Sequence, residues 1–125
     1  MCGIVGLFLK NKAMEPMLGD MLSKMLVTLS ARGPDSAGVA IYGGRDGDNV
    51  KLTLRTADGS SVAEVAEELS AVLHQRVVAI RSNHMVLSVA RNQETSVLTW
   101  LKAHRPDLQI VSAGTNMEIY KDVGL

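Results

Sequence analysis

Apolar residues follow two different spacings along the first part of the chain, and each spacing predicts a type of secondary structure. A short apolar run at residues 3–10 is rich in strand-forming residues and predicts a buried strand. Apolar residues then recur at every third or fourth position, as on one face of a helix, with Pro16 in its first turn. This apolar stripe comprises Met14, Met17, Leu18, Met21, Leu22, Met25, Leu26 and Leu29. Methionine-rich stripes can form adaptable binding grooves, but helical spacing more often marks a core face, which is what we expect here.

Turn-forming residues end the predicted helix. The segment Arg-Gly-Pro-Asp-Ser at 32–36 contains a helix breaker and turn-forming side chains, so the helix should end near Ala31. Residues 38–42, Gly-Val-Ala-Ile-Tyr, then predict a strand that the glycine pair at 43–44 should end. The first part of the chain is therefore predicted to be strand, helix and strand.

Residues 50–113 form a second pattern that is complete in itself. Apolar and polar residues alternate over 50–56, with Lys51, Thr53 and Arg55 on the polar side of the predicted strand. The elements predicted next are a helix with an apolar face from Val62 to Leu73, strands at 77–80 and 85–89, a helix at 96–104 and a strand at 108–112. This order is the split βαβ pattern of ferredoxin-like modules, which are usually scaffolds and less often bind small effectors. One more short strand is predicted at 117–120.

Composition and charge narrow the class of protein. The chain has 125 residues, 13 basic and 13 acidic, and one tryptophan, two tyrosines and one phenylalanine. Zero net charge and few aromatic residues argue against binding to nucleic acid or to an anionic membrane surface. No apolar run approaches the roughly 20 residues of a membrane span, and the N-terminus lacks the features of a secretory signal. We therefore expect a soluble, cytoplasmic protein of one domain with at most a small insertion.

The single cysteine is residue 2, and this position changes its interpretation. One cysteine and three scattered histidines give no disulfide and no metal-ligand spacing, so we expect neither a metal nor another cofactor. A lone cysteine is usually a small buried apolar residue. Removal of Met1, however, would leave Cys2 with a free α-amino group that can act as general base for its own thiol. One residue would then supply both nucleophile and base.

Two sequence motifs together carry a resemblance to a known family. Taken alone, Arg32–Gly38 is a turn in which Asp35 and Ser36 form local hydrogen bonds and Gly38 relieves crowding. With MCGIVGLF at 1–8 and RGPDSAGVAIY at 32–42, in this order and spacing, the chain resembles the class II glutamine amidotransferases of the N-terminal-nucleophile hydrolase fold. A weaker match is Met-Glu-Ile-Tyr-Lys-Asp-Val-Gly at 117–124. Pro34 and the inserted segment make the chain most similar to the glutamate-synthase-related amidotransferase subunit of N-methylglutamate synthase.

The resemblance implies a fold class, a domain organisation and a set of site residues. The implied fold is α+β: part of a four-layer αββα fold with a ferredoxin-like βαββαβ insertion. Residues 1–49 would begin the amidotransferase domain, 50–113 would be the insertion, and 114–125 would return to the domain. Cys2 would attack the side-chain amide of glutamine, form a γ-glutamyl thioester and release ammonia. The residues implied to support this nucleophile are Arg32, Gly33, Asp35, Ser36 and Gly38.

Other groups that the family uses cannot be placed in this sequence. The family has an Arg-bearing segment for the substrate α-carboxylate, an Asn-Gly pair for the oxyanion and an acidic residue for the ammonium group. We therefore expect a truncated domain, from a split gene, a truncated gene or a fragment, with turnover near background when isolated. The implied partners are glutamine and a synthase subunit or remaining domain that takes the ammonia, and self-association stays open. The alternative is a non-catalytic fragment, or a regulatory or partner-binding module built on residues 50–113.

Overall fold

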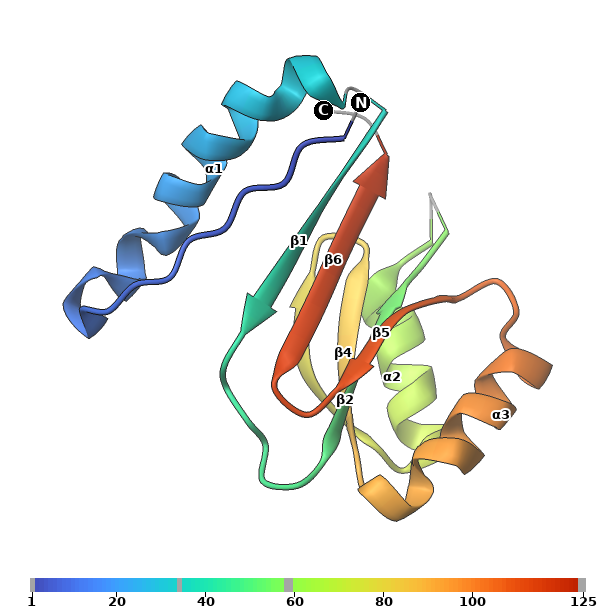
Figure 1. Cartoon of the computed structure of the whole chain (residues 1–125). Coiled ribbons are helices and arrows are strands. Elements are labelled where there is room, and N and C mark those ends of the chain that lie inside the picture. Colours follow the sequence, from blue (N-terminus) through green and yellow to red (C-terminus); the bar gives the residue numbers. More distant parts are fainter. Residues whose placement is uncertain (1, 34, 58–59, 124–125) are drawn as a thin grey trace. The chain divides into compact units, whose positions relative to one another are not determined.

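The computed structural model of the chain describes residues 2–33, 35–57 and 60–123, and it contains two compact units (Figure 1). The N-terminal unit comprises Met1–Ala37 and Asp122–Leu125, and the central unit comprises Gly38–Lys121. No helix among the described residues is both long and apolar enough to cross a membrane. Each unit is described in turn.

The N-terminal unit is built on one long helical segment. It begins with the 3-10 helix η1 (Lys12–Met17), continues as α1 (Leu18–Leu29) and ends with the 3-10 helix η2 (Ser30–Arg32). The Asn11 side chain accepts a hydrogen bond from the Ala13 amide at 3.1 Å and so caps the start. The predicted helix and its end near Ala31 are confirmed. The core expectation is only partly met, because the apolar stripe is half-buried, and Met17 is 49% exposed.

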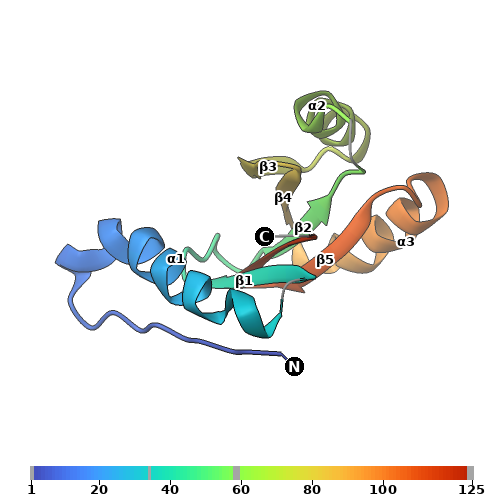
Figure 2. The same ribbon diagram turned by 90° about the horizontal axis from the view of Figure 1, so that it is seen from above.

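The buried strand predicted at residues 3–10 is wrong for this structure. Residues 2–9 are extended but belong to no strand, and they run alongside α1 (Figures 1 and 2). Their side chains alternate as in a strand: Val5, Leu7 and Leu9 are half-buried, whereas Ile4 and Phe8 are 97% and 83% exposed. The period of a strand is therefore present, but among the described residues no neighbouring strand supplies the ladder of hydrogen bonds that a sheet requires.

The central unit contains a four-stranded antiparallel sheet and two helices. Its elements are β2 (Val50–Arg55), α2 (Val62–Leu73), β3 (Arg76–Arg81), β4 (His84–Val89), η3 (Arg91–Gln93), α3 (Glu94–His104) and β5 (Gln109–Gly114). The strand order is β3-β4-β2-β5, which is the order of the split βαβ topology. The strands predicted at 77–80 and 85–89 are confirmed as the antiparallel pair β3 and β4. Ser61 caps α2 by accepting a hydrogen bond from the Glu64 amide.

The apolar core lies on one face of this sheet. Leu52 and Leu54 of β2 pair with Leu87 and Met85 of β4, and all four side chains are fully buried. They pack with Leu69 of α2 and Val97 and Leu101 of α3, so both helices cover the same face. Alternation along β2 therefore places Lys51, Thr53 and Arg55 on the opposite face.

A second, two-stranded sheet pairs β1 (Ser36–Tyr42) with β6 (Met117–Val123). The two strands run in opposite directions (Figure 1). The amide of Ile119 in β6 donates to Ser112 Oγ of β5, and the amide of Lys121 donates to His84 Nε2 of β4. β6 thus lies against the polar face of the four-stranded sheet, opposite α2 and α3.

The predicted division of the chain at residues 49/50 and 113/114 stays a prediction, as does the αββα arrangement. The compact units divide the chain elsewhere, because Gly38–Tyr42 and Met117–Lys121 cluster with the segment predicted as an insertion. The hydrogen bonds from β6 to β4 and β5 explain why these strands are part of the central unit.

Candidate functional site

Cys2 lies exposed on the extended N-terminal segment, which makes its thiol accessible. The next residue, Gly3, packs against the last residue of α1: a Cβ built on Gly3 would lie 3.2 Å from a methyl carbon of Leu29. A larger side chain at position 3 would require the end of the Leu29 side chain to shift by a few tenths of an ångström, and glycine avoids this shift. The contact places the segment that carries Cys2 at the C-terminal end of α1. Met1 lies outside the described residues.

Arg32 lies three residues after Leu29, just beyond the C-terminal end of α1. Leu29 passes directly into η2, which ends at Arg32, and the Gly33 amide donates to the Ser30 carbonyl at 3.3 Å. The first motif segment, residues 1–8, therefore packs on the end of the helix that leads into the second, residues 32–42. The observed contact is that of Gly3 with Leu29, three residues before Arg32.

The remaining predicted site residues lie around the start of β1. Pro34 lies outside the described residues, while Asp35 and Ser36 are exposed. Gly38 lies in β1, which confirms the strand predicted at residues 38–42, and its expected role in shaping the preceding turn stays a prediction. A Cβ at Gly38 would lie 3.5 Å from the Tyr120 carbonyl oxygen, an ordinary van der Waals contact. Among the described residues, the side chains of Cys2, Arg32 and Asp35 make no hydrogen bond or ion pair with one another.

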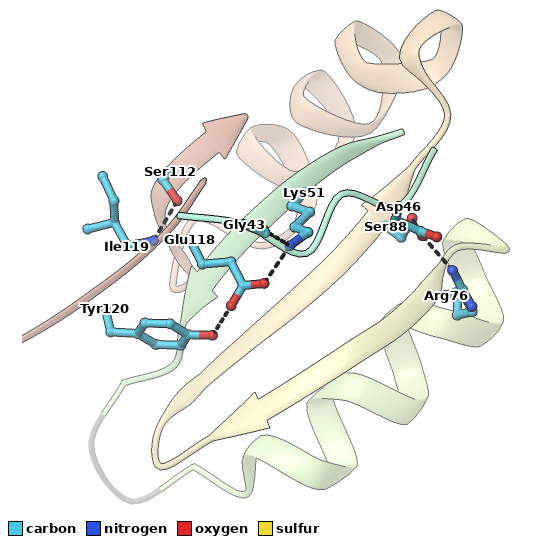
Figure 3. Close-up of polar contacts among 9 residues, drawn as sticks. All are labelled: Gly43, Asp46, Lys51, Arg76, Ser88, Ser112, Glu118, Ile119 and Tyr120. Carbon is cyan, nitrogen blue, oxygen red and sulfur yellow. Dashed lines mark hydrogen bonds and ion pairs between the residues drawn. The ribbon is translucent and has the colours of Figure 1, made fainter. Parts of the chain in front are cut away.

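A buried polar cluster in the central unit was not foreseen as a functional feature (Figure 3). The Lys51 ammonium donates to Glu118 Oε1 at 2.8 Å and to the Gly43 carbonyl at 3.3 Å. The Tyr120 hydroxyl donates to Glu118 Oε2 at 2.6 Å. The ring of Tyr120 also meets the ring of His84 edge to face, with centroids 5.4 Å apart. Strand alternation predicted the face on which Lys51 lies, but not that another strand would cover it.

Burial and hydrogen bonding oppose each other at Glu118. Burial acts to raise the pKa of Glu118, but the hydrogen bonds from Lys51 and Tyr120 and the charge of Lys51 outweigh it, so this pKa lies below its usual value. Burial and the bond to Glu118 together raise the pKa of Tyr120. At neutral pH, Glu118 is therefore a carboxylate and Tyr120 a neutral phenol.

A second polar cluster joins the loop before β2 to the edge of the sheet (Figure 3). Asp46 accepts hydrogen bonds from Ser88 and, at 2.5 Å, from Arg76. The bond from Ser88 contributes most to lowering the pKa of Asp46, followed by the bond from Arg76. Asn49 donates to Ser88 at 3.0 Å and completes the cluster. No group of three potential metal-ligating side chains occurs among the residues that the structure describes.

Comparisons with known proteins point to glutamine amidotransferases. No family model matches the chain, and no solved structure matches it. The chain is 45% identical over its whole length to the glutamine amidotransferase-like protein GlxB of Rhizobium meliloti, of which it covers 42%. It is 29% identical over 99% of its length to a putative glutamine amidotransferase of Methanothermobacter thermautotrophicus, of which it covers 44%. The chain thus spans less than half the length of these relatives, and over that span it is similar to glutamine amidotransferase-like proteins.

Proposed function

We propose that the chain is the N-terminal part of a class II glutamine amidotransferase domain in which Cys2 is the nucleophile. The packing of Gly3 on Leu29 carries this proposal, because it brings the segment after Cys2 to the end of the helix that leads into Arg32. The contact thus brings the first motif segment close to the start of the second. The chain is also similar over its length to a protein named glutamine amidotransferase-like and to one named a putative glutamine amidotransferase, which supports the amidotransferase part of the proposal.

In the proposed half-reaction the sulfur of Cys2 forms a bond with the side-chain amide carbon of glutamine. The α-amino group of Cys2, free once Met1 is removed, accepts the thiol proton and transfers it to the leaving nitrogen. The carbon–nitrogen bond breaks, ammonia leaves and a γ-glutamyl thioester remains, which water hydrolyses to glutamate. Arg32, with Gly33, Asp35 and Ser36, forms the loop that supports the nucleophile, and Gly38 belongs to the strand that follows this loop.

The oxyanion donors and the groups that bind the amino-acid end of glutamine are proposed to come from the part of the relatives that this chain does not cover. Loss of an oxyanion donor costs roughly 3–4 kcal/mol of transition-state stabilisation. We therefore expect near-background turnover from the 125 residues alone. In the complete assembly the ammonia would pass to a synthase subunit, as in N-methylglutamate synthase.

The test is mass spectrometry of the intact protein after reaction with an electrophilic glutamine analogue. The purified chain is compared alone and together with the unmatched part of GlxB, fused or as a second chain. We expect one adduct on a protein that lacks Met1, no adduct on Cys2→Ala, and ammonia release that requires the added part. Retention of Met1 in most molecules would contradict the mechanism, and strong Cys2-dependent turnover by the isolated chain would contradict the proposed incompleteness.

The alternative function, a partner-binding module on residues 50–113, has one structural feature in its favour. An open groove runs between α2 and β3, and its lining includes Ala63, Ala66, Ser70, Val78 and Ile80. The matched test is Ala63→Trp, an exposed position that lines the groove, against the exposed substitution Glu68→Gln outside it. A loss of partner binding in Ala63→Trp alone, in a folded protein whose Cys2 is inert, would favour this alternative.

A further inference from the structure

One buried ion pair connects the sheet of the central unit to β6. The side chains of Lys51 and Glu118 are 5% and 18% exposed, and they come from strands 67 residues apart in sequence. A buried ion pair contributes little net stability, because the cost of removing two charges from water offsets their attraction. Its best-attested contribution is specificity, since any arrangement that separates the two charges leaves one of them buried alone.

Three hydrogen bonds join β6 to the sheet, and all of them require one register. The Glu118 side chain accepts from Lys51, while the amides of Ile119 and Lys121 donate to Ser112 and His84. Within β6, the Tyr120 hydroxyl donates to Glu118 and so orients its carboxylate. A shift of one residue would turn Met117 or Ile119 toward Lys51 and disrupt the three bonds together. A shift of two residues would place Asn116 or Tyr120 beside Lys51, and neither carries a negative charge.

We propose that Lys51 and Glu118 are positioning residues that fix the register of β6. β6 is paired with β1, and β1 begins at the residue after Asp35. Lys51 also donates to the carbonyl of Gly43, the residue directly after β1, so it binds both β6 and the end of β1. In this proposal the pair fixes where the loop that follows Arg32 ends and where the segment that follows Lys121 begins. Residues 50–113 would then hold β1 and β6 in one register. The link to catalysis rests on the proposed function, but the register itself does not.

The experiment compares four variants of the full chain: Lys51→Met, Glu118→Gln, the charge swap Lys51→Glu/Glu118→Lys, and the control Lys24→Met. The control breaks the exposed pair of Lys24 and Asp20, whose side chains are 75% and 68% exposed. Amide hydrogen exchange is measured for β6 and β1 and, separately, for β2 and β4. Cross-strand proton–proton contacts between β1 and β6, measured by NMR, report the register.

We expect Lys51→Met to raise amide exchange in β6 by about 100-fold or more, because it leaves the Glu118 carboxylate buried without its cation. Exchange in β2 and β4 should change far less, and the cross-strand contacts should show more than one register. Glu118→Gln, which keeps the shape of the side chain, should have the same effect in a milder form. The charge swap should restore protection and a single register, and Lys24→Met should change neither.

Three results would overturn the proposal. They are an unchanged register in both Lys51→Met and Glu118→Gln, a loss of protection equal in all strands, and a charge swap that behaves no better than the single variants. If Lys51→Met does not fold, Glu118→Gln and the swap decide the question.

In the chain supplied with the rest of the domain, the register variants should lower kcat of glutaminase more than they raise KM. An inert Cys2 in the unsubstituted protein would contradict the proposed function while leaving the register result intact.

Discussion

The two units of the chain differ most in how they bury apolar residues. The central unit has a closed core in which Leu52, Leu54, Leu69, Met85 and Leu87 are 0% exposed. In the N-terminal unit no described residue is buried, and Ile4 and Phe8 are almost fully exposed. Both units have the apolar spacing of regular secondary structure, so periodicity alone does not distinguish them. The difference shows that an apolar face becomes a core only when a second face covers it.

The proposed catalytic residues and the apolar core lie in different units of the chain. The residues proposed for catalysis, Cys2 and Arg32, belong to the unit without a core of its own. The unit with the core holds the polar cluster that fixes β6. We therefore expect substitutions in the core of the central unit to affect mainly folding, and substitutions of Cys2 and of the exposed apolar residues in the N-terminal unit to affect mainly activity and association.

The largest expected effect is a loss of stability when the core of the central unit is truncated. Leu87→Ala should lower the free energy of unfolding by about 2–5 kcal/mol, because it removes buried methyl groups and leaves a cavity. Leu22→Ala on the half-buried stripe of α1 should cost less than half as much. Urea unfolding followed by circular dichroism measures both. Equal losses would show that the stripe is as well packed as the core, and would remove the contrast between the units.

The next effect is a dependence of β6 on pH. The pKa of Glu118 is lowered in the folded state, so its contribution to stability is complete above the pKa of the unfolded chain and is lost as the pH falls through the folded-state pKa. Protection of the β6 amides should therefore decrease in acid, below about pH 4. Glu118→Gln should lose this dependence.

The pKa values of Asp46 and Asp107 are also lowered, so the whole protein should lose stability in acid. Exchange of the β2 amides reports this global loss and is subtracted from the change measured for the β6 amides. A β6 protection profile that is identical in Glu118→Gln and the unsubstituted chain would contradict the assigned role of this carboxylate.

A third effect concerns association rather than stability. Phe8→Ser removes an exposed aromatic side chain, so it should change the free energy of unfolding by less than about 0.5 kcal/mol. It should nevertheless reduce self-association in sedimentation velocity, since exposed apolar faces tend to bind one another. Leu7→Ser, on the half-buried side of the same segment, is the matched comparison and should destabilise more. A large loss of stability in Phe8→Ser would mean that this side chain is covered in solution.

The smallest expected effect belongs to the exposed ion pair of α1. Lys24 donates to Asp20 at 2.8 Å, but both side chains are well exposed. Asp20→Asn should therefore cost no more than about 0.5 kcal/mol, and 0.5 M salt should abolish the difference. Thermal unfolding at two salt concentrations measures this. A cost comparable to that of Lys51→Met would contradict the distinction drawn between exposed and buried pairs.

The spacing of apolar residues determined the secondary structure of the central unit almost completely. The helix that Ser61 caps, the strand pair β3–β4 and the alternation along β2 all follow from local patterns of period 2 or 3.6. The same reasoning placed the helix that carries the stripe from Met14 to Leu29, and its end near Ala31. Local sequence also supplied the candidate chemistry, because Cys2 and the Arg32–Ser36 segment form motifs whose order and spacing can be seen without a structure.

Only the tertiary structure decided which of these faces are covered. Residues 3–9 have the alternation of a strand but lack a paired neighbour, which a local pattern cannot reveal. Lys51 was placed correctly on the polar side of its strand, yet whether that side meets water or Glu118 depends on β6, far away in the sequence. The strand predicted at residues 38–42 begins two residues earlier, at Ser36, because pairing with β6 extends β1 into residues whose side chains favour turns. Burial and pairing are properties of two surfaces, and a sequence pattern describes one surface at a time.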